Sequence, residues 1–580
     1  MSKKTSNFIK GAAILSAAGL IVKILGAIFR IPLTRIIGTE GMGLYGLAYP
    51  IYNFLLVISS AGFPVAISKL VAEAVSNSDY KLAHRTFKLS GMLMAALGFI
   101  AMLIMLIFSG FIATLQGNID SKPVLMAIAP SLLFVALLSA YRGYFQGLQN
   151  MVPTAVSQIV EQLIKLIAGL SFAAIMVKQS VQMGAVGALL GITLSEIIAF
   201  LYVVITYAAK RGKIQTDIAA TPATKRISSK RILKNIVKIA IPVAIGASVL
   251  PVVSMIDQLF VINGLKSIIA EINIPGFPYT IEGIQSYASA NYDNMVLTGS
   301  SMTEIAAAYP QIYEGFVTSL TTSLYGILSS ICSPITGLPL VFSTAIAMSV
   351  VPAISEAHAM KSKKQMRRKA AASFRLVALI IVPCAVGIGL LAKPIISVLY
   401  NLESWKLAAT AKCLTILSLT VLFLPMVNTA TSILQGVGKQ NIPVINLIIS
   451  AVVFKIPLTV ILVRIPELNI LGAAIGSVVV YLIAMILDML YVAKYTGIRY
   501  SVRSLLIKPI FCSAGMGICA YAVYSLFGDS HMKIGLIAAV VVGVIIYGLL
   551  LLVTKSLRKE DFRIIPKGEI IAEKLDRFLN

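Results

Sequence analysis

Long apolar runs constrain this chain more than any other feature of its sequence. Read with a window of about 19 residues, they predict about fourteen membrane-spanning helices. A chain in which 58% of the 580 residues are hydrophobic and only 12% are charged cannot hide its apolar surface in a soluble globule. The sequence therefore predicts an all-α, polytopic membrane protein. The expected spans lie near residues 9–37, 44–68, 86–112, 123–148, 153–177, 184–209, 236–263, 319–356, 371–392, 407–434, 443–464, 470–493, 505–527 and 534–554.

Basic residues mark the predicted cytoplasmic side of the membrane. Most Lys and Arg residues lie at the termini and in loops that follow even-numbered spans, above all in Lys210–Lys238, Lys361–Lys369 and Lys555–Arg577. The positive-inside rule then puts both termini in the cytoplasm. Because the formal charge of +26 is spread over such loops, it indicates topology and not nucleic-acid binding. The acidic loop 264–318 is expected outside, either as a cap or as a solvated insertion.

An internal repeat divides the chain. Three pairs of segments are similar between its halves: Gln146–Pro153 with Gln435–Pro443, Gly184–Gly191 with Leu471–Gly476, and Val71–Glu73 with Ile354–Glu356. Two copies of six helices keep the same membrane orientation, so they are expected to enclose a cavity about an axis along the membrane normal. The expected parts are an N-terminal lobe at 1–209, a basic cytoplasmic linker at 210–235, a C-terminal lobe at 236–493, an extra helix pair at 494–554 and a cytoplasmic tail at 555–580.

Five cationic side chains fall inside or at the ends of these apolar spans: Lys23, Arg30, Arg142, Lys165 and Lys455. A charge at membrane depth is costly unless it faces a partner or water, so these residues are candidate binding groups for an anionic cargo. Lys165 and Lys455 lie at the same distance after the repeated prolines Pro153 and Pro443. The alternatives are that these lysines snorkel toward the interface, or that Glu161, one helical turn away, neutralises Lys165.

A second candidate site would bind a coupling ion. Asp257 is an isolated carboxylate in the seventh span, and Asn446 and Ser450 lie one turn apart in the eleventh. They are candidate ligands for Na⁺ or H⁺, although a hydrogen-bonded structural role for Asp257 is the alternative. Glu196 and Asp488 are read as acids on packed helix faces. The sequence has neither a phosphate-binding Gly-x-x-x-x-Gly-Lys-Ser/Thr loop nor a pattern of metal ligands, so it predicts no cofactor and no metal.

Three segments near the N-terminus carry a family resemblance: Lys23–Gly26, Arg35–Gly41 and Gly62–Glu73. They resemble the stage V sporulation protein B group of polysaccharide transporters. That group is related to MurJ-type lipid II flippases within the multidrug, oligosaccharidyl-lipid and polysaccharide exporter superfamily. The resemblance implies fourteen helices, two six-helix lobes arranged in a V with two extra C-terminal helices, and alternating access for an undecaprenyl-pyrophosphate-linked sugar.

The same resemblance implies roles for some residues of this chain, whereas other residues of the family pattern are missing. Lys23 stands where the flippases have a cavity arginine, and Arg30 lies one position past a second one. The segment leading to Asp257 resembles a flippase helix whose Asp is linked to sodium binding. Arginines that the family carries near Leu56 and near Pro334 are missing here.

The sequence therefore predicts a flippase and not an enzyme. It would move lipid II or a related peptidoglycan or polysaccharide precursor across the bacterial cytoplasmic membrane, in cell-wall synthesis, cell shape or sporulation. Its expected partners are the lipid-linked sugar pyrophosphate, membrane lipids and the cell-wall synthesis machinery, and we expect a monomer. Two alternatives stay open. A drug or cation antiporter of the same superfamily would need a more acidic cavity, and a membrane-embedded glycosyltransferase would need catalytic carboxylates near a metal.

Overall fold

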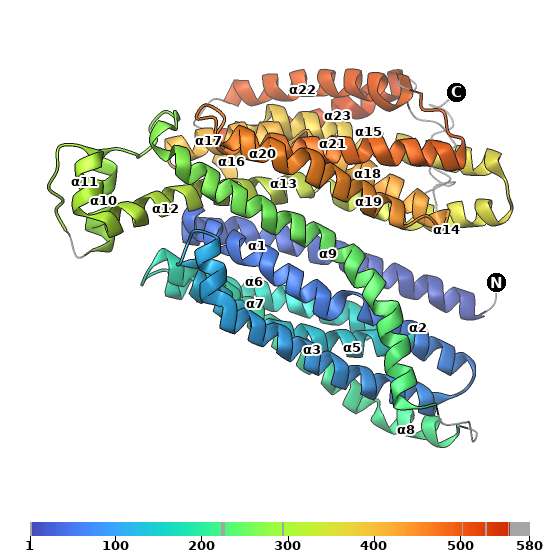
Figure 1. The fold of residues 1–580 in the computed structure, drawn as a ribbon. Coiled ribbons are helices and arrows are strands. Elements are labelled where there is room, and N and C mark those ends of the chain that lie inside the picture. Colours follow the sequence, from blue (N-terminus) through green and yellow to red (C-terminus); the bar gives the residue numbers. More distant parts are fainter. Residues whose placement is uncertain are drawn as a thin grey trace. The chain divides into compact units, whose positions relative to one another are not determined.

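The computed structural model describes residues 3–221, 227–292, 295–501, 503–527, 531–554 and 556. These residues form helices and connecting turns, with no strand among them (Figure 1). The chain divides into two compact units, Met1–Ile262 and Asn263–Asn580. The expected all-α class is thus confirmed.

Among the described residues, the first unit contains eight complete α-helices, most of a ninth and one π-helical turn. Its elements are α1 (Lys3–Leu56), η1 (Val57–Ala61), α2 (Phe63–Ser76), α3 (Tyr80–Leu115), α4 (Ser121–Ile128), α5 (Ser131–Gly147), α6 (Val152–Met176), α7 (Val181–Ala209), α8 (Arg211–Ala219) and α9 (Ser229–Ile268), whose last residues belong to the second unit. The 54 residues of α1 are two helices joined at a kink. Gly38 makes this kink with φ 65° and ψ −174°, a backbone conformation that side chains with a Cβ disfavour.

The second unit begins within the last residues of α9. Its further elements are η2 (Ile269–Glu271), α10 (Ile281–Asn291), α11 (Met302–Ala308), α12 (Pro310–Gly326), η3 (Ile327–Cys332), α13 (Ser333–Gly337), α14 (Leu340–Ala359), α15 (Lys363–Leu390), α16 (Ala392–Leu399), α17 (Ser404–Leu417), α18 (Thr420–Gly436), α19 (Asn441–Ile449), η4 (Ser450–Lys455), α20 (Ile456–Val463), α21 (Ile470–Thr496), η5 (Arg503–Ile507), α22 (Lys508–Phe527) and α23 (Met532–Val553). The predicted external loop 264–318 therefore holds short helices of its own.

Fourteen helical segments among the described residues are long and apolar enough to cross a membrane. The count agrees with the sequence prediction, but the division differs at two places. The first segment, Ala17–Ser76, joins the first two predicted spans across the Gly38 kink. The eighth predicted span corresponds instead to two segments, Pro310–Gly337 and Leu340–Ala359. The chain is a multi-pass membrane protein.

Each unit has its own apolar core. In the first unit, Phe63 and Ile67 of α2 pack with residues of α3 and α5, and Ile236 of α9 joins the same cluster. The predicted linker 210–235 contains α8 and the start of α9, and its Ile214 and Ile232 are buried in this core. The two compact units accordingly part within α9 and not at the predicted linker.

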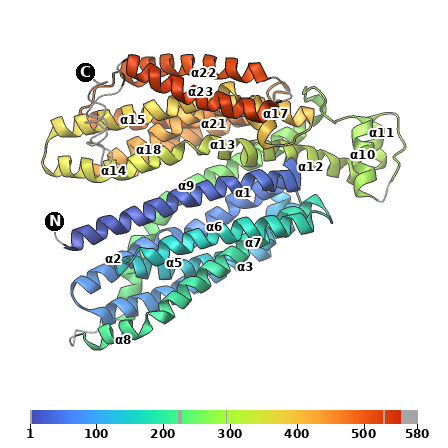
Figure 2. The same cartoon turned by 180° about the vertical axis from the view of Figure 1, so that it is seen from behind.

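The core of the second unit lies among α14, α15, α18 and α21, where Phe374 and Ile433 are fully buried. The predicted extra pair of helices, α22 and α23, packs together beside α15 (Figure 2). Tyr547 of α23 donates its hydroxyl to the backbone oxygen of Leu379 in α15, at 2.7 Å. The added pair is therefore an integral part of the second unit.

Glycine contacts repeat between the two units in the same register. A Cβ on Gly187 would lie 2.5 Å from the backbone oxygen of Phe172, and a Cβ on Gly472 would lie 2.5 Å from the backbone carbon of Leu462. Such contacts let the helix backbones approach closely, which stabilises helix pairs in membranes. Phe172 and Leu462 each lie seven residues after the paired lysines of the sequence repeat. The α6/α7 and α20/α21 pairs thus place Lys165 and Lys455 at equivalent positions.

A further pair of contacts supports the repeat. A Cβ on Gly147 would lie 2.6 Å from Cβ of Val71, and a Cβ on Gly436 would lie 2.9 Å from Cβ of Ile354. These are the residues that the repeated sequence motifs bring into correspondence. Each half therefore packs its second and fourth predicted spans together in the same way.

Two π-helical turns carry similar sequences. The η1 turn (Val57–Ala61) contains Ser59 and Ser60, and η3 (Ile327–Cys332) contains Ser329 and Ser330. The hydroxyl of Ser60 donates to the backbone oxygen of Leu56, so a serine side chain satisfies an acceptor beside the irregular turn. A proline follows each turn, which lowers the demand for regular α-helical hydrogen bonds there.

Candidate functional site

Lys165 lies over two aromatic rings within the first unit. Its Nζ is 5.3 Å from the ring centroid of Phe29 and 5.7 Å from that of Tyr49. Phe29 is contributed by the first half of α1 and Tyr49 by the half that follows the Gly38 kink, while α6 carries the lysine. Ring faces attract the ammonium without removing its positive charge. Lys165 therefore remains a cation that an anionic group can pair with.

Arg30 makes a similar contact on the same helix hairpin. Its guanidinium carbon is 5.8 Å from the ring centroid of Tyr45. Tyr45 is almost fully buried and stacks on Tyr49 with 5.4 Å between ring centroids, and Tyr49 in turn contacts Tyr52. The second half of α1 thus presents a ladder of tyrosine rings to cations from the first half and from α6.

Arg142 and Glu161 form an ion pair between α5 and α6. The Nη2 of Arg142 donates to Oε2 of Glu161 at 2.9 Å, and its Nε donates to the Ser157 hydroxyl, also at 2.9 Å. Both charged side chains are mostly buried, with 15% and 20% exposed. Glu161 therefore pairs with Arg142 from another helix, and the sequence-local partner Lys165 is held instead by aromatic rings.

The remaining predicted residues of the first unit lie on α1, α7 and α9. Lys23 lies on α1 with an exposed side chain, and Asp257 lies half-buried on α9. Glu196 of α7 is buried, and its Oε2 has no hydrogen-bond partner among the described residues. The first unit thus holds an unsatisfied buried acceptor in addition to its cations.

In the second unit, Lys455 is buried at the end of the π-helical η4 turn. The predicted ion ligands Asn446 and Ser450 are also buried and adjacent, because the Ser450 hydroxyl donates to the backbone oxygen of Asn446 at 2.7 Å. The side chain of Asn446, however, donates to Oδ1 of Asp488 on α21, at 2.7 Å. The carboxylate that accepts a hydrogen bond from Asn446 is therefore Asp488.

The sequence did not identify the three aromatic residues that contact Lys165 and Arg30, namely Phe29, Tyr45 and Tyr49. A signal existed for the tyrosines, since Tyr45, Tyr49 and Tyr52 follow one another at helical spacing and so share one face of the helix. Their contact with α6 depends on tertiary packing that sequence spacing does not give. Over the described residues, no group of three or more His, Cys, Asp or Glu is placed to hold a metal ion.

Comparison with known families identifies the chain as a membrane transporter related to polysaccharide biosynthesis proteins and to lipid II flippases. A family model described as "Polysaccharide biosynthesis protein" matches residues 8–358, and one described as "Lipid II flippase MurJ" matches residues 330–542. The chain is 24% identical over 565 residues to the lipid II flippase MurJ of Bacillus subtilis (strain 168), covering 93% of this chain and 94% of that protein. It is 26% identical over 569 residues to stage V sporulation protein B of the same organism, covering 98% of each.

Solved structures show the same fold. An inward closed conformation of the lipid II flippase MurJ matches with a TM-score of 0.61 at 16% identity, over 93% of this chain and 98% of that one. An inward-facing multidrug resistance MATE family transporter of the MOP superfamily matches with a TM-score of 0.59 at 15% identity, over 82% and 94%. The resemblance found in the sequence is thereby confirmed.

Proposed function

Because the chain belongs to the polysaccharide biosynthesis protein family, we propose that it is a flippase for a lipid-linked sugar pyrophosphate. The cargo would be lipid II or a related peptidoglycan or polysaccharide precursor, moved through the bacterial cytoplasmic membrane by alternating access. Its similarity to a lipid II flippase and to stage V sporulation protein B supports this cargo class. The protein would act as a transporter of unchanged lipid and not as an enzyme.

The observation that carries the proposal is the pair of ring-bound cations in the first unit. Lys165 and Arg30 contact aromatic faces, which position a positive charge without neutralising it. A pyrophosphate brings negative charge that hydrocarbon cannot solvate, so cations of this kind are what it needs inside a membrane protein. The polyprenyl tail can stay in the surrounding lipid.

We assign the five predicted cations different parts in this function. Lys165 and Arg30 contact the pyrophosphate in the first unit, and Lys455, at the equivalent place in the repeat, is the corresponding cargo-binding residue of the second unit. Lys23, which is exposed on α1, attracts the head group electrostatically. Arg142, whose charge Glu161 already compensates, contributes chiefly by holding α5 against α6.

The coupling ion is assigned to carboxylates at membrane depth. We place Na⁺ or H⁺ at Asp257 in the first unit, and at Asn446 and Ser450 in the second, with Asp488 added because it accepts from Asn446. Movement of one charge through the membrane potential is worth about 2.3 kcal/mol per 100 mV, enough to bias a transport cycle. Both termini would face the cytoplasm, as the distribution of basic loops predicts.

Reconstitution in vesicles tests the proposal. The purified protein is inserted into liposomes that contain lipid II, and the fraction of lipid II accessible from outside is followed with time. We expect transport by the parent chain and a rate at least about 10-fold lower for Lys165→Ala, since a hydrogen bond between charged groups is worth about 1.5–3 kcal/mol. Lys23→Ala and Lys455→Ala should also slow it.

Lys210→Ala is a matched control. Its Nζ lies 5.5 Å from the ring centroid of Phe145, so it makes the same kind of contact at the end of α7. Its rate should stay within about twofold of the parent, because the residue carries no cargo role in this proposal. Equal rates for the parent and Lys165→Ala at equal insertion would refute the cargo site. Chemical turnover of the lipid would indicate an enzyme, and proton- or sodium-driven cation export would indicate an antiporter.

A further inference from the structure

A basic pocket lies at the start of α15, within the second unit and apart from the residues assigned to the cargo. The cavity measures about 740 Å³, which is within the usual range for pockets that hold small molecules. Two elements line it: the first turns of α15 and the end of α21, where Thr496 and the left-handed Gly497 terminate the helix. Its cationic lining residues are Lys363, Lys364, Arg367, Arg368 and Arg375.

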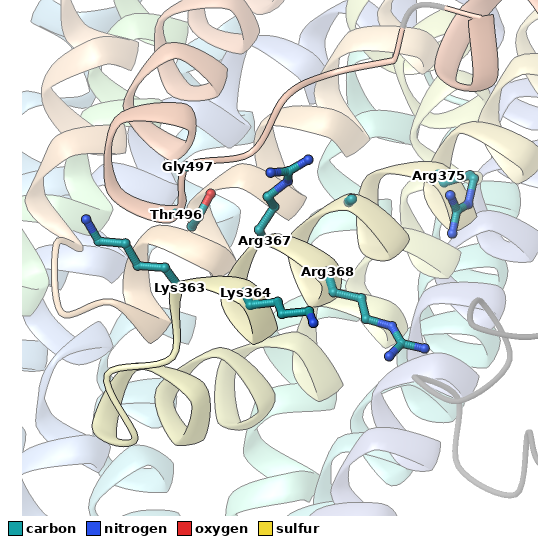
Figure 3. A pocket seen from close by; sticks show the side chains of 8 residues that line it. Lys363, Lys364, Arg367, Arg368, Arg375, Thr496 and Gly497 are labelled. Atoms are coloured by element: carbon teal, nitrogen blue, oxygen red, sulfur yellow. The ribbon is translucent and has the colours of Figure 1, made fainter.

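Helical spacing places three of these cations along one side of α15. Lys363, Arg367 and Arg375 follow one another in steps of four or eight residues, so they form a stripe, with Ala371 completing the row. Figure 3 shows the side chains fanning out from this helix, with Thr496 and Gly497 facing them. The small side chain of Ala371 leaves room in the middle of the stripe.

None of the described residues that line this pocket is Asp or Glu. Neighbouring like charges at a spacing of four residues repel one another, so Lys363 and Arg367 destabilise the helix unless an anion compensates them. The start of a helix adds further positive potential, because its backbone N–H groups have no partners within the helix.

Another lysine of α15, outside the pocket lining, forms an ion pair with an acidic residue of α14. Lys369 donates to Oε2 of Glu356 at 3.0 Å and to the backbone oxygen of Ala353 at 2.9 Å, both in α14. That ion pair fixes α15 against α14. The pocket side of the helix receives no such carboxylate from the described residues that line it.

We propose that this pocket binds a phosphate group. Arginine and lysine side chains are the groups that recognise phosphate, arginine by a planar fork of donors and lysine as a point charge. The volume exceeds what one phosphate needs, so it accommodates the attached glycerol or a second phosphate. The proposal does not depend on which cargo the protein moves.

The position of the pocket along the helix favours the head group of an anionic membrane lipid. The 28 residues of α15 extend about 42 Å, whereas the hydrocarbon core is about 30 Å thick. Roughly two turns therefore lie outside the hydrocarbon, and the residues Lys363–Arg368 occupy the first two turns. A basic pocket at this level is the setting in which anionic head groups are bound. A soluble phosphate has the same chemistry and is the other source.

Binding by the purified full-length protein in detergent distinguishes these sources. Native mass spectrometry measures retention of phosphatidylglycerol, phosphatidylcholine with identical acyl chains, and inorganic phosphate. The test variant is K363Q/R367Q, which removes two exposed cations from the stripe. The control is K234Q/K238Q, which removes two exposed cations at the same spacing on α9.

We expect the parent to retain phosphatidylglycerol over phosphatidylcholine, and K363Q/R367Q to bind it about 25-fold more weakly. The control variant should bind like the parent. Binding of inorganic phosphate that is equally sensitive to K363Q/R367Q would support the site with a soluble ligand as its source. The proposal would be overturned by two results obtained together. The first is that the parent retains both lipids equally, or that both variants lose phosphatidylglycerol equally. The second is that K363Q/R367Q leaves the binding of inorganic phosphate unchanged.

Discussion

The ion pair between Arg142 and Glu161 should contribute measurably to the stability of the first unit. Its 2.9 Å contact joins two side chains of which only 15% and 20% is exposed. Unit charges about 4 Å apart attract by about 4 kcal/mol at an effective dielectric constant of 20. Since a fifth or less of each side chain meets solvent, we expect a coupling free energy of about 3 kcal/mol.

A double-mutant cycle measures this coupling. Arg142→Gln leaves a buried carboxylate uncompensated, and Glu161→Gln leaves a buried guanidinium uncompensated, so each single change should destabilise the protein strongly. The double variant buries neither charge alone. The sum of the two single costs should therefore exceed the cost of the double variant by about 3 kcal/mol.

Calorimetry of the purified protein in detergent gives the result as a shift in Tm. The first unit comprises residues 1–262, and at an unfolding entropy of about 2.1 cal/mol/K per residue it loses about 0.55 kcal/mol per kelvin. The coupling then corresponds to about 5 °C. Shifts that add to within about 1 °C would refute the reasoning, because they would mean that the pair has no net interaction in the folded state.

Three further outcomes follow from particular contacts. Gly191→Val should destabilise the protein by about 3 kcal/mol or more, because its Cβ would come within 2.3 Å of the facing α6 backbone; Gly91→Ala, with open space, should be neutral or slightly stabilising in the same melt. Asn446→Ala should cost about 1–3 kcal/mol by removing the 2.7 Å donor to the buried Asp488 carboxylate, and adding Asp488→Asn should recover part of the loss in Tm. Hydrogen bonds from the backbone N–H and the hydroxyl of Ser300 lower the pKa of Glu304. They therefore stabilise the loop fully above the unfolded pKa of about 4.3, and this stabilisation is lost as the pH falls through the lower folded pKa. Hydrogen exchange near α11 should rise over that pH range, and Glu304→Gln should remove the pH dependence.

Much of the fold could be predicted because it depends on patterns among residues that are close together in the sequence. Apolar runs of membrane length gave the helices, and the repeated prolines gave the register that pairs Lys165 with Lys455. The glycine contacts of α6/α7 and α20/α21 have that same register. The break inside the eighth predicted span lies at Gly337–Pro339, so a local signal for it existed in the sequence. The core position of α8 could not be predicted, since it depends on packing by residues distant in the chain.

The candidate site was less predictable, because its partners come from different helices. Glu161 lies one turn from Lys165 in sequence, yet it pairs with Arg142, nineteen positions away on α5. Likewise, Asn446 selects Asp488 on α21. Helical spacing identifies which residues share a face, but not which helix covers that face. Charged residues at membrane depth could be identified from the sequence, and their compensation could not.

The serine-containing π turns η1 and η3 change how the helices after them must be read. Each π turn accommodates one residue more than a regular turn, and one residue corresponds to about 100° around an α-helix. Side chains beyond Ala61 and beyond Cys332 therefore point about 100° away from where an uninterrupted helical wheel would draw them. A scan of cysteine accessibility along either helix should show its periodic pattern jump in phase at that residue.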